Sequence, residues 1–191
     1  MIHSKCKVIF SYGHKREGTC IDGFYKDRVL TGGNDGQAIL WKLSDETQLL
    51  YKSNCQALDC VHTISEKHFV TTGEQATIEL WNVAKRVPIF TLENAHKSLW
   101  ISSLAGLKNA DLLATGSTDG YVNLYQFSNE ENTIHTIRQI PLEGSINGMQ
   151  FSQNGNMLIC SQGDEQRLGR WDVIKKTKPG ISIFTNLLIK P

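Results

Sequence analysis

Residue types that often carry catalysis or bind metals are present in this chain, but their spacing does not build a reactive site. The chain has 191 residues, with six histidines and five cysteines. His62 and His68 are too irregularly spaced for a zinc-binding helix, and no C-x-x-C pair joins them. The sequence also lacks a G-x-S-x-G turn, a P-loop and a G-x-G-x-x-G fingerprint. We therefore expect no catalytic residue, no metal site and no cofactor.

Basic side chains are the remaining candidates for chemistry, because lysine and arginine bind phosphates and arginine also stacks on unpaired bases. Residues 166–191 hold six basic residues and one acidic residue, whereas the first 165 residues hold 14 basic and 18 acidic residues. The candidates for RNA or partner binding are Lys15, Arg16, Arg167, Arg170, Lys175, Lys176 and Lys178. The alternative is a solvated terminal strand that its lysines keep soluble. Arg167 and Arg170, three apart on one expected strand, would point to opposite faces.

The bulk composition fits an ordinary globular protein, with 40% hydrophobic and 20% charged residues. No apolar stretch approaches the roughly 20 residues of a membrane-spanning helix, so we expect no membrane association. The cysteines are odd in number and scattered, at Cys6, Cys20, Cys55, Cys60 and Cys160. This pattern favours a reducing compartment, with the thiols as small core residues.

Four segments line up as an internal repeat of a β-rich run, a glycine-containing turn and a second β-rich run. They are VLTGGNDGQAILWKL (29–43), VTTGEQATIELWNV (70–83), LLATGSTDGYVNLYQF (112–127) and LICSQGDEQRLGRWDV (158–173). Their aromatic residues, Trp41, Trp81, Tyr125 and Trp171, are 40, 44 and 46 residues apart. This period and the W-D-like ending resemble the WD repeat, whose four strands form one blade of a β-propeller. A lone blade cannot bury both faces, so blades must stack around an axis.

The resemblance to the WD repeat implies a buried polar network inside each blade, formed by an entry-loop histidine, a strand hydroxyl, a turn aspartate and a tryptophan. The first unit keeps all four, as His14, Thr31, Asp35 and Trp41. The third keeps His96, Thr115 and Asp119, with Tyr125 in the tryptophan position. Gln75 and Glu165 replace the aspartate in the second and fourth units, which also lack the histidine. We expect those two blades to depend more on apolar packing, and the network residues to be structural rather than catalytic.

We therefore predict an all-β WD-repeat β-propeller of about four blades over residues 1–191. The approximate blades are 12–53, 54–93, 94–140 and 141–190, with 1–11 as the outer strand of a preceding blade and 181–188 as the outer strand of the last. WD-type rings usually close with more blades, and an open half-ring would leave a strand edge unpaired. Two alternatives remain: the C-terminal half of a larger propeller, or half of a homodimeric eight-bladed ring.

Several stretches are more particular than the repeat. They are WKLSDETQLLY (41–51), LDCVHTISEKHFV (58–70), AHKSLWISSLAGLKNADLLATGS (95–117), IPLEGSINGMQFSQNGNML (140–158) and QRLGRWDV (166–173). Together they resemble the C-terminal blades of the WD-repeat proteins of the U-three small nucleolar ribonucleoprotein. WISSL and RLGRW are far more specific to that family than the generic repeat residues.

That resemblance implies a non-catalytic, nucleolar protein of pre-rRNA processing and small-subunit ribosome biogenesis. The implied partners are a box C/D-type small nucleolar RNA of the U-three type, a small kink-turn-binding protein and proteins of the small-subunit processome. Members of that family carry an N-terminal extension and further blades before this point, which this sequence does not contain. The alternative function is a generic WD-repeat scaffold for protein–protein interaction, whose partner binding would survive nuclease treatment.

Overall fold

The computed structural model describes residues 13–107, 110–167, 169–174, 177–185 and 187, without the side chains of residues 169–172. Over these residues the chain forms seventeen β-strands and one short 3-10 turn, η1 (Glu74–Ala76). The prediction of an all-β propeller is therefore confirmed. The strand expected within residues 1–11 lies outside the described residues. None of the helical structure described in this chain is long and apolar enough to cross a membrane.

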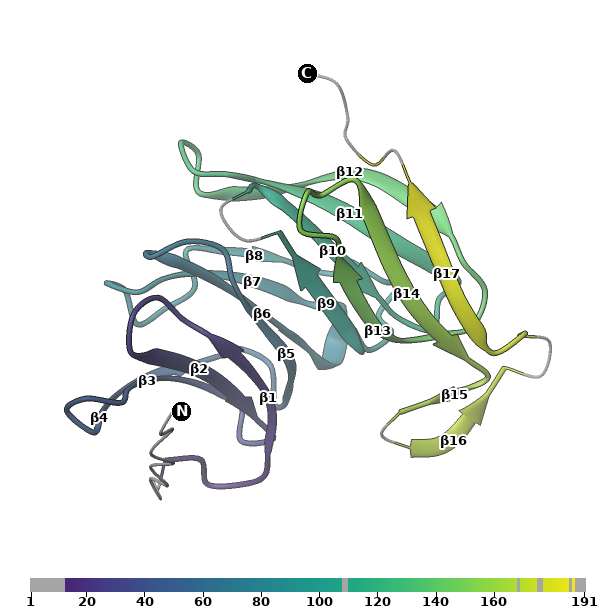
Figure 1. Ribbon diagram of the computed structural model, residues 1–191. Coiled ribbons are helices and arrows are strands. Elements are labelled where there is room, and N and C mark those ends of the chain that lie inside the picture. Colours follow the sequence, from purple (N-terminus) through teal and green to yellow (C-terminus); the bar gives the residue numbers. More distant parts are fainter. Residues whose placement is uncertain (1–12, 108–109, 168, 175–176, 186, 188–191) are drawn as a thin grey trace, which may run out of the picture.

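Three sheets each have four antiparallel strands in sequence order. Blade one comprises β1 (Gly18–Gly23), β2 (Arg28–Gly33), β3 (Gln37–Lys42) and β4 (Thr47–Lys52). Blade two comprises β5 (Leu58–Thr63), β6 (His68–Gly73), β7 (Ile78–Asn82) and β8 (Phe90–Leu92). Blade three comprises β9 (Ser103–Gly106), β10 (Leu112–Gly116), β11 (Tyr121–Ser128) and β12 (Thr133–Pro141). The blades follow one another along an arc, with the first strand of each blade on its inner side (Figure 1).

The turn between the second and third strands of each blade shows why the sequence repeats there. Gly36 and Gly120 adopt φ values of +67° and +87°, which glycine accepts at little cost. Blade two has no glycine at this place. Gln75 and Ala76 take up the left-handed conformation instead, at φ values of +68° and +53°. This turn therefore keeps its shape with residues that disfavour it.

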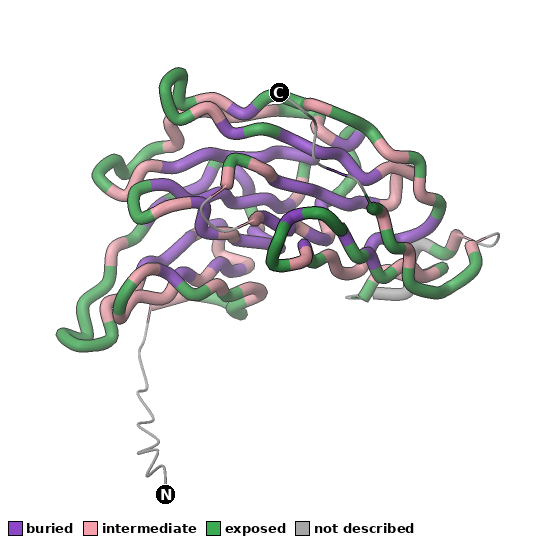
Figure 2. Tube along the Cα trace, turned by 45° about the horizontal axis from the view of Figure 1, so that its top comes forward, coloured by how far each residue is buried: buried purple, intermediate pink, exposed green. Residues whose placement is uncertain are grey.

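The hydrophobic core is divided into three layers, each between two consecutive blades. The layer between blades one and two includes Leu30, Leu40, Tyr51, Leu58, Phe69 and Trp81. The next includes Val70, Leu80, Ile101, Leu113, Tyr125 and Phe127, and the last includes Ala114, Leu124, Ile146, Phe151, Leu158 and Cys160. Buried segments accordingly run along the strands, and exposed segments lie at the turns (Figure 2). Each blade thus depends on its neighbours for its buried surface.

Blade four differs from the predicted strand order. β13 (Ser145–Phe151), β14 (Met157–Gly163) and β17 (Gly180–Thr185) form a three-stranded sheet, while β15 (Glu165–Gln166) and β16 (Gly169–Val173) form a separate hairpin. Phe184 pairs with Leu158 on the face toward blade three, as Trp81 pairs with Phe69 on the face toward blade one. The expectation that residues 166–173 supply the strand beside β14 is therefore wrong, because β17 takes that place; β17 is also the outermost strand of this sheet. The physical reason is that four of the five residues of ISIFT (181–185) are β-branched or aromatic, whereas RLGRW contains a glycine and two charges.

One face of blade four is apolar and exposed. Ile159, Ile181 and Ile183 are 38%, 71% and 59% exposed. On the opposite face, Leu158 and Cys160 are fully buried against blade three. The exposed face is the one that a following blade would cover in a propeller.

Candidate functional site

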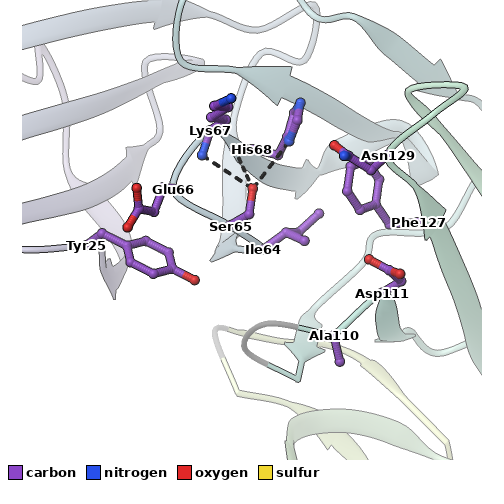
Figure 3. Close-up of a pocket in the computed structure, with 10 residues that line it drawn as sticks. All are labelled: Tyr25, Ile64, Ser65, Glu66, Lys67, His68, Ala110, Asp111, Phe127 and Asn129. Atoms are coloured by element: carbon purple, nitrogen blue, oxygen red, sulfur yellow. Dashed lines mark hydrogen bonds between the residues drawn. The ribbon is translucent and has the colours of Figure 1, made fainter.

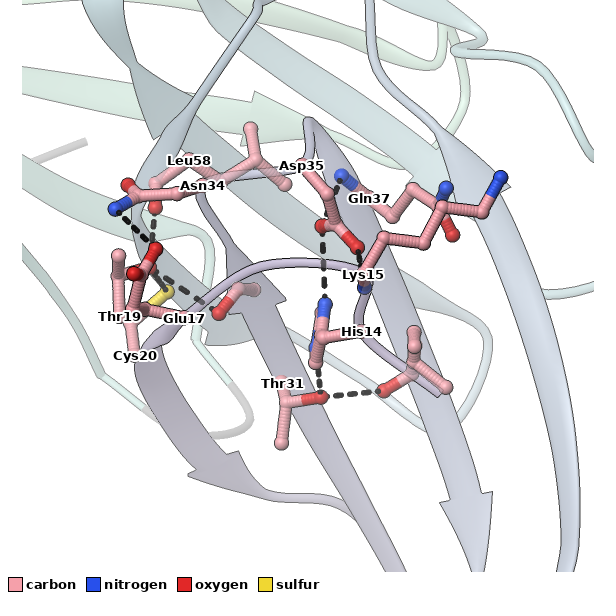
Figure 4. Close-up of polar contacts among 12 residues, drawn as sticks. His14, Lys15, Glu17, Thr19, Cys20, Thr31, Asn34, Asp35, Gln37 and Leu58 are labelled. Carbon is pink, nitrogen blue, oxygen red and sulfur yellow. Dashed lines mark hydrogen bonds and ion pairs between the residues drawn. The ribbon is translucent and has the colours of Figure 1, made fainter. Parts of the chain in front are cut away.

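The polar network of blade one brings together His14, Thr31, Asp35 and Trp41. His14 Nδ1 lies 3.0 Å from Asp35 Oδ1, and His14 Nε2 lies 2.8 Å from Thr31 Oγ1 (Figure 4). The Trp41 indole N–H donates to the same hydroxyl at 2.8 Å. Because Thr31 accepts from Trp41, its own O–H is available for Nε2, and the Nδ1–H then donates to Asp35. A neutral histidine therefore satisfies every member of the network.

The backbone completes this network at Asp35. The backbone N–H groups of Lys15 and Gln37 donate to its carboxylate at 2.7 and 3.2 Å. Burial raises the pKa of Asp35, but the hydrogen bonds from Lys15, His14 and Gln37 outweigh it and hold the pKa below its ordinary value of 3.8. The ionised side chain therefore ties the loop that enters the blade to the β2–β3 turn.

Blade three contains the same arrangement in a fully buried form. His96 Nδ1 lies 3.0 Å from Asp119 Oδ1, and His96 Nε2 lies 2.7 Å from Thr115 Oγ1. The Tyr125 hydroxyl lies 3.4 Å from Thr115 Oγ1, so this contact is weaker than that of Trp41. Asn123 donates to the carbonyl oxygen of Ala95 at 2.7 Å and so fixes the loop that carries His96.

Blade two has a different network, which the sequence comparison missed. Glu79, on β7, is fully buried and accepts hydrogen bonds from Ser53 Oγ at 2.5 Å and from the Asn54 backbone N–H at 2.9 Å. Thr71 Oγ1 lies 3.3 Å from Glu79, and it accepts the Trp81 indole N–H at 3.0 Å. The carboxylate thus replaces both the histidine and the turn aspartate. The only sequence signal is an acidic residue at the Ile39-equivalent position of an otherwise apolar strand.

Blade four has no equivalent network among the residues that the structure describes. Glu165 lies on the separate β15 strand, and its backbone carbonyl accepts a hydrogen bond from Asn147 at 2.8 Å. Ser161 lies on the exposed face of β14 and donates to the backbone of Gly148 at 3.3 Å. The expectation that blade four relies on packing agrees with this geometry, whereas the same expectation for blade two does not.

The described basic candidates Lys15, Arg16 and Arg167 lie at one end of the inner strands, because both the loop before β1 and the hairpin after β14 are at that end (Figure 1). Lys15, Arg16, Arg167 and Lys178 are exposed. Arg167 lies in the turn between β15 and β16, whereas Arg170 lies on β16. The expectation that both arginines lie on one strand is therefore wrong. Arg170 is on β16, but its side chain lies outside the description, as do Lys175 and Lys176 altogether.

The hollow beside the β5–β6 turn could hold a small molecule of modest size, at about 600 Å³ (Figure 3). It is lined by Tyr25, Ile64, Ser65, Glu66, Lys67, His68, Ala110, Asp111, Phe127 and Asn129. The two ring nitrogens of His68 lie 3.3 Å from Ser65 Oγ and 3.1 Å from Asn82 Nδ2. Burial lowers the pKa of His68, so its imidazole is neutral at pH 7. Both ring nitrogens are thus occupied by contacts within the fold.

The described cysteines are free thiols that burial keeps protonated. Cys20, Cys55, Cys60 and Cys160 form no disulfide with one another. Burial raises the pKa of Cys20 to about 11, and those of Cys60 and Cys160 to about 12. Since the thiolate is the nucleophile, these side chains are poor candidates for covalent chemistry.

Comparisons with known proteins agree with this geometry. The family described as "WD domain, G-beta repeat" matches residues 86–126. The human "U3 small nucleolar RNA-interacting protein 2" is 35% identical over 148 residues, which are 73% of this chain and 31% of the relative. The Arabidopsis thaliana "U3 snoRNP-associated protein-like EMB2271" is 29% identical and matches 90% of this chain and 39% of the relative.

A solved structure described as "Structure of U3-55K" superposes on this chain with a TM-score of 0.89 and 33% identity. The match covers 93% of this chain and 57% of the solved one. The chain spans between about a third and two fifths of the length of these curated relatives. The repeat period, the blade geometry and both kinds of comparison agree, and the chain is therefore a WD-repeat β-propeller protein that resembles proteins associated with the U3 small nucleolar ribonucleoprotein.

Proposed function

We propose that this chain is a non-catalytic component of a U3-type small nucleolar ribonucleoprotein. In this role it binds small nucleolar RNA and partner proteins during pre-rRNA processing and small-subunit ribosome biogenesis, in the nucleolus. The observation that carries the proposal is the 33% identity to the U3-55K structure over 93% of the chain. The relatives named for U3 in human and Arabidopsis thaliana support the same role.

The RNA-binding surface that we propose is the basic end of blade four. Arg167 and Lys178 are exposed on either side of β16, and Arg170, Lys175 and Lys176 belong to the same segment of the chain. Lysine and arginine at such a position can bind phosphates without any sequence readout. Lys15 and Arg16 are weaker candidates, because Arg16 lines a pocket together with Glu17, Asp59 and Glu74, whose carboxylates repel phosphates.

The proposed protein partners are a small kink-turn-binding protein, processome proteins and whatever covers the apolar face of blade four. Ile159, Ile181 and Ile183 on that face match the need of a propeller for a further blade. Either further blades or a second copy of this chain could supply it. Light scattering distinguishes these: a mass of about 43 kDa, twice the 21.4 kDa of the chain, indicates a homodimer, and 21.4 kDa excludes one.

The experiment that tests the function is sequencing of the RNA that co-purifies with the tagged chain from its own cells. Enrichment of one box C/D RNA of the U3 type is expected. The double variant Arg167→Glu and Lys178→Glu should lose most of that RNA, and the slope of log affinity against log salt should fall by about 1.4 to 1.8 for two lost phosphate contacts. The matched control is Lys52→Glu with Lys85→Glu, which changes two exposed lysines elsewhere by the same charge.

The second candidate function is a generic protein–protein scaffold, as many WD-repeat proteins are built only to bind proteins. It predicts no enriched RNA and a set of protein partners that resists nuclease. It also predicts that both double variants behave like the unmodified chain in RNA recovery. That combination of results would refute the ribonucleoprotein role for this chain.

A further inference from the structure

The inner strands of blades one to three carry equivalent residues at the junction with the next blade. Register shifts occur between Gly18 and Cys20 in β1 and between Leu58 and Cys60 in β5. The bulges place Thr19 and Asp59 at corresponding positions. Ser102 immediately precedes β9 and takes the same position in blade three, since Ser103 pairs with Gly116 as Cys20 pairs with Gly32. A bulge of this kind redirects a side chain out of the regular alternation of the strand.

Two of these three residues use a hydroxyl group to fasten their blade to the next one. The Thr19 hydroxyl contacts the Leu58 carbonyl oxygen in blade two and the Gly32 carbonyl oxygen, 3.1 Å away, in its own blade (Figure 4). The Ser102 hydroxyl donates to the Ile146 carbonyl oxygen in blade four at 2.8 Å and lies 3.4 Å from that of Gly116. We call this contact the junction clamp.

Asp59 interrupts the pattern, because an ionised carboxylate has no proton to donate to a carbonyl oxygen. It is only 7% exposed, and it has no hydrogen bond or ion pair with any residue that the structure describes. Burial raises the pKa of Asp59, the nearby Glu74 raises it further, and Arg167 lowers it. A buried carboxyl group without a partner is costly, so a ligand that pairs with it would gain from doing so.

The carboxyl group of Asp59 lines a pocket of about 600 Å³ at the junction of blades one and two. The pocket also contains Glu17 and Glu74, with Arg16 as its single basic residue, and the half-exposed Trp100 forms part of the wall. Three carboxylates against one guanidinium leave the pocket negative. The described residues contain no group of three His, Cys, Asp or Glu side chains arranged to hold a metal ion. The pocket is therefore suited to an organic cation rather than to a metal.

We propose that this pocket binds an arginine side chain of a partner protein. The planar guanidinium can donate to Asp59 and Glu74 at once, which an ammonium group does less well, and it can stack on the indole ring of Trp100. Arg16 at the rim and Arg167 near Asp59 are the residues of this chain that compete for the same carboxylates. The proposal does not depend on the ribonucleoprotein role, because it is argued only from the carboxylates and the indole ring that line this pocket.

The test is a titration of the full chain with the peptide acetyl-Ala-Arg-Ala-amide, followed through the NMR signal of the Trp100 indole N–H. The signal is assigned with the Trp100→Phe variant. Saturable binding with a dissociation constant below about 1 mM is expected. The same peptide with citrulline in place of arginine keeps the shape and loses the charge, and it should bind at least about tenfold more weakly. Glu66→Gln changes an exposed carboxylate outside the pocket and should bind the arginine peptide unchanged.

Two variants of the buried carboxylate separate binding from structure. Asp59→Asn removes the charge with little change of shape, and Asp59→Thr restores the junction clamp that Thr19 makes in blade one. Both should lose at least about tenfold in affinity for the arginine peptide, while Asp59→Thr should fold at least as stably as the unmodified chain. The absence of saturable binding, equal binding of the citrulline peptide, or unchanged affinity in Asp59→Thr would each overturn the proposal.

Discussion

Replacement of Glu79 by alanine tests whether the carboxylate network of blade two stabilises the propeller. Glu79 is fully buried and accepts hydrogen bonds from Ser53 Oγ at 2.5 Å and the Asn54 N–H at 2.9 Å. Hydrogen bonds to charged groups contribute about 1.5 to 3 kcal/mol each, so the two bonds together contribute about 3 to 6 kcal/mol. The variant also removes a buried carboxylate that has no cation beside it, which offsets part of this loss. We expect a net decrease of about 2 to 4 kcal/mol in the free energy of unfolding.

The assay is urea unfolding followed by tryptophan fluorescence, to which the buried Trp81 of the same blade contributes. For a chain of this size the expected decrease corresponds to a fall of about 4 to 16 °C in Tm. Glu131→Ala is the control, because Glu131 contacts the exposed His135 on the surface and its loss should leave the stability almost unchanged. If Glu79→Ala proves no more destabilising than Glu131→Ala, the carboxylate network does not hold blade two together and the reasoning is refuted.

Three further predictions concern the blades and their thiols. Asp35→Asn should destabilise blade one at pH 7. The pKa of Asp35 in the folded chain lies below its ordinary value of 3.8, so the stability difference from the unmodified chain should shrink as the pH falls below 3.8 and vanish below the folded-state pKa. Unfolding curves across pH 2 to 7 check this. Gln75→Gly should raise the free energy of unfolding by up to about 1 kcal/mol, since the exposed Gln75 holds φ at +68°, and a decrease would show that the turn is not strained. Cys60 and Cys160 should react slowly with iodoacetamide at pH 8 in the folded chain and quickly in urea, and mass spectrometry measures both rates. Rapid reaction of the folded chain would contradict the raised pKa values of about 12.

The sequence was sufficient to predict the propeller because each blade repeats local signals: short alternating runs, glycine turns and a third-strand aromatic residue. It was not sufficient for blade four. There, the RLGRW and ISIFT segments both have strand character, and the choice between them as the partner of β14 is made by long-range pairing. Competition of this kind depends on the whole sheet, so periodicity alone assigned to Trp171 the position that Phe184 occupies.

Some of the candidate site residues could be predicted from the sequence, and others could not. His14 and His96 could be found from residue types, because their partners recur at fixed spacing around the turn aspartate. Glu79 could not, since its donors come from the loop after β4 and its role depends on the pairing of Thr71 with Glu79 across the sheet. Asp59 required the bulge in β5 and the comparison with Thr19 in three dimensions. A sequence pattern therefore cannot identify residues whose role depends on which residues pair across the strands.

The division of the core into three layers governs how the molecule should open. Blades two and three each share two layers with their neighbours, whereas blades one and four, within the described residues, each share one. In a linear array with nearest-neighbour coupling, an end unit loses half the contact free energy that a central unit loses. Transient opening should therefore begin at the ends and advance inwards, and amide hydrogens of β6 and β10 should exchange with solvent more slowly than those of β2 and β14. The chain would therefore unfold blade by blade from its ends, as repeat proteins do, rather than in one all-or-none step.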